Sequence, residues 1–346
     1  MPSTRMPLTV RHYEPRDLGE IAAVRARAHA RARATTPALP GRYENSGEWV
    51  GLLTHALLDS GADIAVAERD GRIVGFLGGT RSMPAPDSFW AQYTPPHSIS
   101  IPVAGHAVDD NEPAVEVYRA LYAYLSARWA EDGFFVHHAA LLASDRATLD
   151  AWFLLGFGAN VTLSYRDLSP LGSAADAGDI ELHDATVADL PALQRLDELE
   201  SLHHREPPIF WPHLGRDVSA AVEAFQRSAL DNPRQRLVVA WRGAEPLGMH
   251  FLMGEGGFGG PAVSPEGSLY LYQAIVEPNA RGQGVGNALL AHTVEWARAE
   301  GYGAIVLHYA SMNPSGAPYW EGHGFVPLEI TVERRLDERI AWARKR

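Results

Sequence analysis

The sequence predicts a mixed α/β fold, arranged as two similar domains in tandem. Length supports two domains, because the chain has 346 residues and single domains usually have about 100–200. The composition, with 46% hydrophobic and 21% charged residues, is that of a globular protein. An internal repeat and an alternation of strand and helix patterns favour the same architecture.

The repeat consists of three pairs of segments in the same order, each offset by about 170 residues. The pairs are Leu8–Tyr13 with Ile180–Asp184, Ile64–Ala67 with Leu237–Ala240, and Trp152–Phe157 with Trp320–Phe325. Between the copies, Ser169–Gly178 is small, polar and contains Pro and Gly, as linkers do. We therefore expect domains at 1–170 and 178–346.

Both halves show the same order of elements. A short strand opens each half, helical stretches follow, and two strands then flank a tight turn. A third strand leads into a long helix with apolar residues three and four positions apart, and a fourth strand precedes a short helix that ends in Gly-Phe. Strands are expected at Leu8–Tyr13, Ile64–Glu68, Ile73–Gly78, Ile99–Val108, Phe134–Ala140, Ile180–His183, Leu237–Trp241, Leu247–Met253, Leu269–Glu277 and Ala304–Tyr309, and long helices at Pro113–Glu131 and Gly284–Glu300. This alternation implies at least one parallel crossover.

Composition excludes several kinds of chemistry. The chain has no Cys, which rules out disulfides, thiolate zinc sites and a cysteine nucleophile. Lys345 is the only lysine, so the body of the protein has neither a Schiff-base lysine nor a phosphate-loop lysine. The net charge of −12 argues against nucleic acid as a partner.

Location and surface charge give further expectations. Met1–Arg11 has no apolar segment of a signal peptide, and no stretch approaches the roughly 18 apolar residues of a membrane span. A cytoplasmic protein with no membrane partner is therefore expected. Arginines 25, 27, 31 and 33 alternate with other residues. They predict a solvated helix face, with contact to an acidic ligand or partner as the alternative.

The segment Gln273–Asn287 joins an apolar strand to a helix and is the most informative part of the sequence. The first turn of a helix offers unpaired N–H groups and about half a unit of positive charge. Glycines let such a backbone approach a phosphate closely, and Arg281 adds a fixed positive charge. The turn therefore predicts a pyrophosphate site.

Two other phosphate motifs do not fit this turn. A Walker loop requires Gly-Lys-Ser/Thr, and the segment contains no lysine. A dinucleotide fingerprint counted from Gly282 requires a third glycine where Asn287 stands.

Arg281-x-x-Gly284-x-Gly286 after Val276-x-Pro278 resembles the acetyl-CoA signature of the GNAT acyltransferase superfamily. Asn313, Ala317 and Gly324-Phe325 resemble the downstream part of that pattern, and the resemblance covers most of residues 180–330. Together with the repeat, it implies two tandem GNAT-like domains. Each would have a mixed, mostly antiparallel sheet with a splayed central strand pair and flanking helices.

The resemblance also implies a cofactor site for acetyl-CoA, used as co-substrate, with no metal. Backbone N–H groups would hold the pyrophosphate, the splayed strand edge would bind the pantetheine, and the Val276 N–H would polarise the acetyl carbonyl. Asn313 would steady the pantetheine arm. The implied cofactor-binding residues are Ile275, Val276, Arg281, Gly282, Gln283, Gly284, Val285, Gly286, Asn287, Asn313 and Trp320.

The catalytic residues are less well defined by the pattern. In the family the general acid is usually a Tyr four residues before the glycine of Gly-Phe, and here that position is Trp320. The neighbouring Tyr319 is the candidate acid, although one residue along a helix turns a side chain by about 100°. Tyr270 and Tyr272 are the candidate bases that we favour. His308, Tyr309, His203, His204, Glu206 and His213 are further candidates.

The first half lacks the pyrophosphate residues. Pro113, Glu116 and Tyr118 stand where Arg281, Gly284 and Gly286 stand in the second half, and Asp109, Asp110 and Glu112 would repel a diphosphate. We therefore expect a degenerate N-terminal copy.

The sequence thus predicts an N-acetyltransferase, active in its C-terminal domain, that moves an acetyl group to a small amine. The alternatives are a non-catalytic acyl-CoA-binding or regulatory protein, and a transferase with a hydroxyl acceptor or a longer acyl donor. A monomer, in which the tandem domains form a pseudo-dimer, and a homodimer are both compatible with this interpretation.

Overall fold

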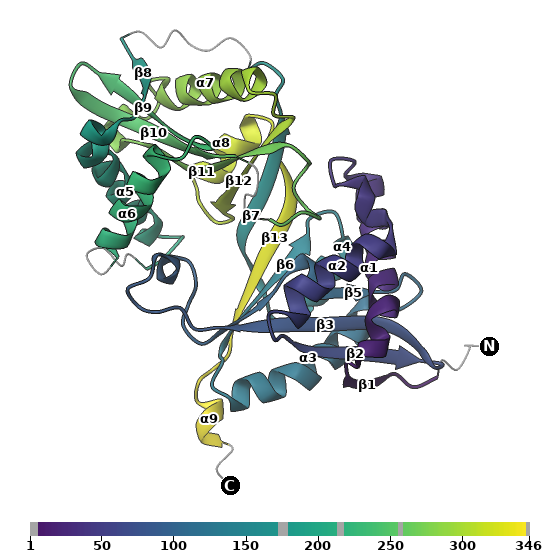
Figure 1. Ribbon diagram of the computed structural model, residues 1–346. Coiled ribbons are helices and arrows are strands. Elements are labelled where there is room, and N and C mark those ends of the chain that lie inside the picture. The colour runs from purple at the N-terminus through teal and green to yellow at the C-terminus, as the bar shows by residue number, and fades with distance from the viewer. Residues whose placement is uncertain (1–5, 172–178, 213–217, 255–258, 344–346) are drawn as a thin grey trace. The chain divides into compact units, whose positions relative to one another are not determined.

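The computed structural model describes residues 6–171, 179–212, 218–254 and 259–343. The chain forms two compact units (Figure 1). The first unit contains the chain up to Pro84, Thr94–Val161 and the chain from Leu328 onward. The second unit contains Ala85–Tyr93 and Thr162–Pro327.

These units differ from the predicted domains, 1–170 and 178–346, which were defined by the repeat and stay a prediction. Strands β7 (Gly158–Asp167) and β13 (Val326–Arg335) each begin in one unit and end in the other. The segment Ala85–Tyr93 belongs to the first half of the sequence but to the second unit. Most of the expected linker, residues 172–178, lies outside the described residues.

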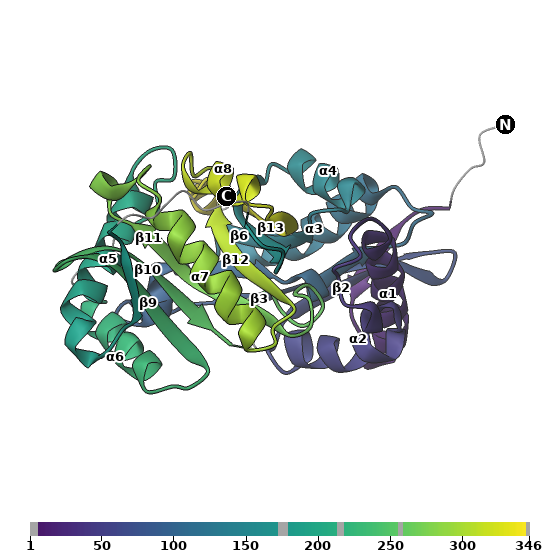
Figure 2. The same ribbon diagram turned by 90° about the horizontal axis from the view of Figure 1, so that it is seen from above.

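The first unit is a sheet covered by helices on both faces. Its strands follow the order β1-β2-β3-β4-β6-β13, with β5 paired to β3, and β4 with β6 is a parallel pair. Helices α1 and α2 lie on one face and α3 and α4 on the other (Figure 2). The bounds are β1 (Thr9–His12), α1 (Leu18–Thr35), α2 (Ser46–Leu53), β2 (Asp63–Arg69), β3 (Arg72–Ser82), β4 (Ser98–Ile101), β5 (His106–Val108), α3 (Ala114–Glu131), β6 (Val136–Leu142), α4 (Arg146–Leu154) and α9 (Ile340–Ala343).

Two expectations for the first unit need correction. The strand expected at Ile99–Val108 is divided into β4 and β5, because Pro102 has no N–H to continue a ladder and a turn at Val103–Gly105 follows it. The solvated face predicted for the α1 arginines is wrong for Arg25, which is 3% exposed. Arg25 lies one turn along the helix from the buried Ile21, and its guanidinium stacks on Trp49, 4.6 Å from the ring centroid.

The second unit has the strand order β7-β12-β11-β10-β9-β8. Helix α7 covers one face, and α5 and α6 cover the other (Figure 1). A core that includes Leu289, Val294 and Ile305 fills the α7 side, and one that includes Leu193, Leu196 and Phe251 fills the α5 side. The bounds are β8 (Glu181–Asp184), α5 (Leu190–Arg205), α6 (Ser219–Leu230), β9 (Gln235–Arg242), β10 (Glu245–Met253), β11 (Ser268–Val276), α7 (Val285–Ala299), β12 (Ala304–Ala310) and α8 (Gly316–Gly322).

The mixed, mostly antiparallel architecture predicted for each domain is confirmed. Each unit has a parallel pair, β4 with β6 in the first and β11 with β12 in the second, among neighbours such as β2–β3 and β9–β10 that are antiparallel. Among the described residues, we find no helix of the length and apolar character that crossing a membrane requires.

Candidate acyl-CoA site

The splayed strand pair lies in the second unit, between β11 and β12. These parallel strands are in register from Ser268 opposite Ala304 to Leu271 opposite Leu307, and their pairing stops there. Beyond that point β11 continues to pair only with β10, as far as Val276 opposite Gly248. Tyr272 is the extra residue of a β-bulge where the two strands begin to separate. The opening exposes one edge of β11 to a ligand.

Strand alternation shows which backbone groups face this opening. The Glu277 N–H donates to the Leu247 oxygen of the β10 segment at 2.8 Å. Since successive residues of a strand point their N–H and C=O groups to opposite edges, the groups of Val276 and Ala274 face away from β10. By the same alternation Ile275 pairs with Met249 on β10. The Val276 oxygen accepts a hydrogen bond from Arg281 Nε at 3.3 Å.

The glycine turn follows directly after this edge. Gly282 and Gly284 have φ values of +75° and +86°, which favour glycine, and Gly284 is the N-cap of α7. No atom lies within 4 Å of where a Cβ would stand at either glycine. Arg281, Gly282 and Gln283 are exposed, and Val285 anchors the helix in the core. The first turn of α7 therefore presents its N–H groups at an open surface that suits a diphosphate.

A second arginine lies beside this turn. Arg242 of β9 donates from Nη1 to Gln283 Oε1 at 3.2 Å and from Nε to Asp179 Oδ1 at 3.0 Å. Gln283 in turn donates to the Asn279 oxygen at 2.7 Å. No sequence motif contains Arg242, because its proximity to the turn comes from the order of strands β9 to β11.

Asn313 lies between β12 and α8. Its Oδ1 accepts hydrogen bonds from the Ser315 and Gly316 N–H groups, at 3.0 and 2.9 Å, and so caps α8. The predicted contact of Asn313 with a pantetheine arm would use its Nδ2.

Trp320 and Tyr319 of α8 have different surroundings. Trp320 is 8% exposed and packs edge-on against Phe325, with ring centroids 5.2 Å apart. The Tyr319 hydroxyl is buried without a hydrogen-bond partner and would lie 3.3 Å from a Cβ at Gly286. Desolvation raises the pKa of Tyr319. Tyr319 thus reaches the first turn of α7, next to the predicted pyrophosphate site.

Tyr270 and Tyr272, the other predicted catalytic residues, lie where the strands separate. The Tyr270 hydroxyl is 3.0 Å from His308 Nδ1, and the Tyr272 hydroxyl is 2.7 Å from the Tyr93 hydroxyl. Burial lowers the pKa of His308 to about 4, so its imidazole is neutral at pH 7. Burial raises the pKa of both tyrosines. These phenols therefore stay protonated at neutral pH.

Two carboxylates of α5 complete this group. Gln273 Nε2 donates to Asp197 Oδ1 at 2.8 Å and also to Glu200 Oε2. Glu200 as a residue is only half-buried, but desolvation of its carboxyl group raises the pKa to about 8. Sequence reasoning missed both residues. The available signal was a glutamate on the apolar face of α5, four residues after the buried Leu196.

The remaining candidate bases lie elsewhere in the second unit. His203 Nε2 is 3.4 Å from the Ser315 hydroxyl, and the His204 ring packs against Trp211. Tyr309 is buried beside β7, and Glu206 is exposed after α5. His213 lies outside the described residues. Within the described ranges, no group of three or more potential ligands is arranged for a metal ion.

In the first unit, a side chain occupies the position that corresponds to the opening between β11 and β12 in the second unit. His106 of β5 bridges to Ala140 of β6, with Nε2 2.9 Å from the carbonyl oxygen and Nδ1 2.9 Å from the Tyr118 hydroxyl. Burial lowers the pKa of His106 to about 4, so the neutral ring donates from Nε2 and accepts at Nδ1. The space that corresponds to the β11–β12 opening is filled.

Ion pairs occupy the start of α3 in the same unit. Asp109 binds Arg27 at 2.6 Å, Asp110 binds Arg31, and Glu112 binds Arg69 at 3.0 Å. The acidic residues expected there are thus engaged with arginines of the same unit.

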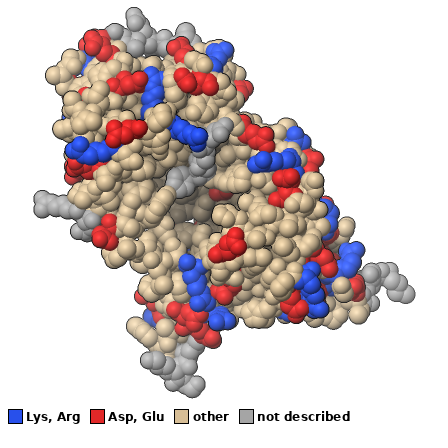
Figure 3. All heavy atoms as spheres, viewed as in Figure 1, with Lys and Arg blue, Asp and Glu red and all other residues tan. Residues whose placement is uncertain are grey.

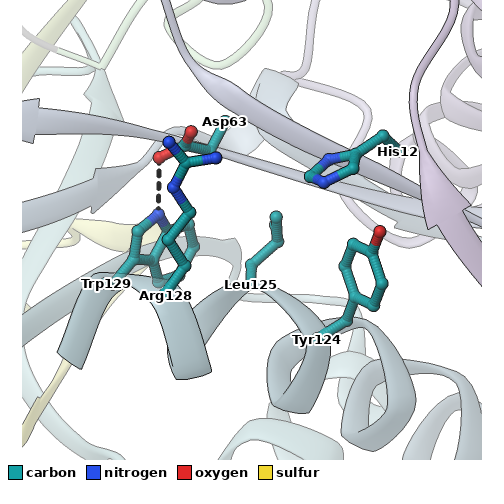
Figure 4. A pocket seen from close by; sticks show the side chains of 6 residues that line it. All are labelled: His12, Asp63, Tyr124, Leu125, Arg128 and Trp129. Atoms are coloured by element: carbon teal, nitrogen blue, oxygen red, sulfur yellow. Dashed lines mark hydrogen bonds between the residues drawn. The ribbon is translucent and has the colours of Figure 1, made fainter. Parts of the chain in front are cut away.

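A cavity of about 80 Å³ in the first unit, lined by His12, Asp63, Tyr124, Leu125, Arg128 and Trp129, is shown in Figure 4. Typical small-molecule pockets have about 300–1,000 Å³. Asp63 is already bound by Trp129 Nε1 at 2.9 Å. This cavity is too small for an acyl-CoA.

Charged side chains of both signs lie on the surface. On the face shown in Figure 3, arginines and acidic residues are interspersed, and no broad basic patch is visible there.

The open N-terminus of α7 beside the splayed strand pair has the geometry of a phosphate-binding site. Residues 196–325 match the acetyltransferase (GNAT) family. No curated protein matches the chain. The family match covers part of the second half of the chain, and a solved tandem GNAT protein shares the fold of nearly the whole chain.

Solved structures share this fold along nearly the whole chain. A GCN5-related N-acetyltransferase from Sphaerobacter thermophilus is 14% identical, covers 95% of this chain and 96% of its own, and has a TM-score of 0.58. A tandem GNAT protein from the clavulanic acid biosynthesis pathway is 13% identical, covers 95% and 98%, and has a TM-score of 0.51. A GCN5-related glucosamine N-acetyltransferase region of a fungal multi-domain protein is 13% identical, covers 96% and 38%, and has a TM-score of 0.55.

Proposed function

We propose that the chain is an acetyl-CoA-dependent N-acetyltransferase whose second unit transfers the acetyl group to a small amine. The observation that carries the proposal is the position of the open, glycine-lined start of α7 directly after the free edge of β11. The matching GNAT family supports acyl transfer in general. The acetyl donor and the amine acceptor are our proposal.

The residues present fit acetyl-CoA. The N–H groups from Gly282 to Asn287 would bind the diphosphate, with Arg281 and Arg242 as nearby positive charges. The Ala274 and Val276 edge would pair with the pantetheine, and Asn313 Nδ2 would hold its arm. Trp320 would contribute by packing beneath the pantetheine arm.

The chemistry is direct transfer. The amine nitrogen attacks the thioester carbonyl carbon, a C–N bond forms, the C–S bond breaks, and CoA leaves with the electron pair. Glu200, which is ionised above about pH 8, takes the proton that the amine loses. The Val276 N–H stabilises the negative charge that develops on the carbonyl oxygen. Tyr270 and Tyr272 orient the acceptor through their hydroxyl groups.

The way in which the CoA thiol leaves is relevant to a second candidate function. A free thiol has a pKa of about 8.5, so thiolate can leave near neutral pH without a strong acid. Tyr319, the predicted acid, would instead have to reach the sulfur from the start of α7. Trp320 at the usual acid position therefore favours, as the second candidate, a non-catalytic acyl-CoA-binding protein.

We also propose that the first unit is a degenerate copy that binds no CoA. His106 fills the strand opening, and the α3 start carries acidic residues in ion pairs. One acetyl-CoA per chain is expected. We further propose a cytoplasmic location, with neither nucleic acid nor membrane as a partner.

The test uses the full chain. Isothermal titration with acetyl-CoA should give a stoichiometry of one, and a thiol-release assay with a panel of amines should show acceptor-dependent turnover. Binding without turnover for every amine would support the binding protein instead. Absence of binding would refute both functions, and two bound molecules would refute the degenerate first unit.

A further inference from the structure

We propose that the acceptor is an aromatic primary amine, and that the segment Ala85–Tyr93 supplies side chains that select it. This inference rests on the proposed transferase function. The segment belongs to the first half of the sequence and is part of the second unit. It contains Phe89, Trp90 and Tyr93 within five positions.

The segment contacts the place where the strands separate. The Tyr93 hydroxyl is 2.7 Å from the Tyr272 hydroxyl, across 179 positions of sequence. Tyr272 is the bulge residue of β11, directly after its last pairing with β12. Tyr93 therefore stands next to the point where the acetyl carbonyl would meet the acceptor.

The surroundings of this contact are aromatic. The Phe89 and Phe225 ring centroids are 4.4 Å apart, and Phe225 meets Tyr272 at 5.5 Å. The exposed fractions of Trp90 and Tyr93 are 50% and 54%, so about half of each residue is accessible to a ligand. Aromatic rings bind one another in offset or edge-to-face geometry. The segment thus offers surface that suits an aromatic ring rather than a charged chain.

The ammonium group has its own partners. Asp197 and Glu200 both hydrogen-bond to Gln273, the residue after Tyr272, and their charges act on Tyr272 and Tyr93. The ammonium group of the acceptor would lie near these two carboxyl groups, at the opening between β11 and β12. The aromatic group of the acceptor would then lie toward Phe89 and Tyr93. Asp87 is the only acidic residue in the segment, which gives a polyamine little to bind.

The experiment compares three acceptors with the full chain and saturating acetyl-CoA. 2-Phenylethylamine represents the aromatic class, n-butylamine the aliphatic class and spermidine the polyamines. We expect kcat/KM for 2-phenylethylamine to exceed that of the other two by at least about tenfold, the range over which apolar pockets discriminate.

Substitutions assign that preference to the segment. Phe89→Ala and Tyr93→Phe should each raise KM for 2-phenylethylamine about three- to tenfold, with KM for n-butylamine and acetyl-CoA binding unchanged. Phe89→Leu keeps the packing volume and should give a smaller loss. Phe153→Ala and Tyr124→Phe, at side chains of 37% exposure in the first unit, are the matched controls and should change nothing.

The outcomes separate this inference from the function beneath it. Turnover without aromatic preference, or a preference that survives Phe89→Ala and Tyr93→Phe, overturns the inference alone. Binding of acetyl-CoA without turnover of any amine overturns both.

Discussion

At the scale of single residues, the proposed mechanism makes Glu200 the group that determines the pH at which the site acts. It is the carboxyl group near the strand opening whose pKa desolvation raises to about 8, while Gln273 holds it in place. A base with a pKa near the working pH is well matched to proton transfer, because it is partly ionised and still basic. His308 is neutral and hydrogen-bonded to Tyr270, and it therefore orients that phenol.

Replacing Glu200 with Gln tests this role. The variant keeps the shape and loses the base, so kcat should fall by about a hundredfold or more. In the native protein, kcat should rise with pH to a plateau above about pH 8, and the variant should lose that limb. Glu198→Gln, at an exposed position of the same helix, is the control and should keep the native profile. An unchanged profile in Glu200→Gln would exclude Glu200 as the base.

The residues that sequence reasoning found and those that it missed differ in a physical way. Val276, Gly282 and Gly284 act through backbone conformation within one continuous segment, and local spacing encodes that conformation. The proposed roles of Glu200 and Tyr93 depend on side chains that tertiary packing brings to β11 from 73 and 179 positions away, so local spacing in the sequence does not reveal them.

At the scale of elements, the two long helices α3 and α7 begin in different surroundings. Helix α7 begins after Gly284, and no atom lies within 4 Å of a Cβ position at Gly282 or Gly284, whereas α3 begins after Pro113 among acidic residues bound by arginines. Both helices pack similarly against their sheets, so the difference lies in the turn before the helix. The sequence predicted this contrast well, because turn residues are contiguous.

Gly284→Glu tests the start of α7. A non-glycine residue at φ +86° costs about 1 kcal/mol of stability, and the new carboxylate would face the diphosphate. Acetyl-CoA binding should weaken by at least about a hundredfold through like-charge repulsion. Titration calorimetry measures the binding, and urea unfolding measures the stability.

Gly301→Glu is the matched control for that variant. Gly301 follows the other end of α7, has φ +82° and also has nothing within 4 Å of a Cβ position. The new carboxylate would lie at the negative end of the helix dipole, so this variant should lose at least as much stability and keep full binding. Equal losses of acetyl-CoA binding in the two variants would contradict a diphosphate site at the start of α7.

At the scale of the whole molecule, the chain passes between the units more than once. Residues 328–335 of β13 pair with β6 of the first unit, although they end the second half of the sequence. The internal repeat shows which segments of the two halves are similar, but it does not show which strands pair. The sequence therefore could not predict that β13 pairs with β6. A chain cut at residue 170 would separate β6 from this strand, and tests on isolated halves would therefore report misfolding rather than binding.

Buried titratable groups in both units give an expected dependence of stability on pH. Burial lowers the pKa of six histidines to about 4 or 3: His29, His106, His137, His204, His250 and His308. Their unfolded forms bind protons below about pH 6.5 and their folded forms do not. The free energy of unfolding therefore falls as pH decreases from 6.5, by up to about 1.4 kcal/mol per pH unit for each histidine.

Two acids act in the opposite direction. Burial raises the pKa of Glu200 and of Glu329, in the second and first units, to about 8. The folded protein keeps these protons between about pH 4.5 and 8, where the unfolded chain has lost them, so stability falls as pH rises through that range. Six histidines outweigh two acids below about pH 6.5, and the acids act alone above it. Urea unfolding from about pH 5 to 8.5 should therefore show maximal stability near pH 6.5, with the steeper fall on the acid side. The double variant Glu200→Gln, Glu329→Gln should lose the alkaline fall and keep the acid one, and an alkaline fall that persists in this variant would assign it to other groups.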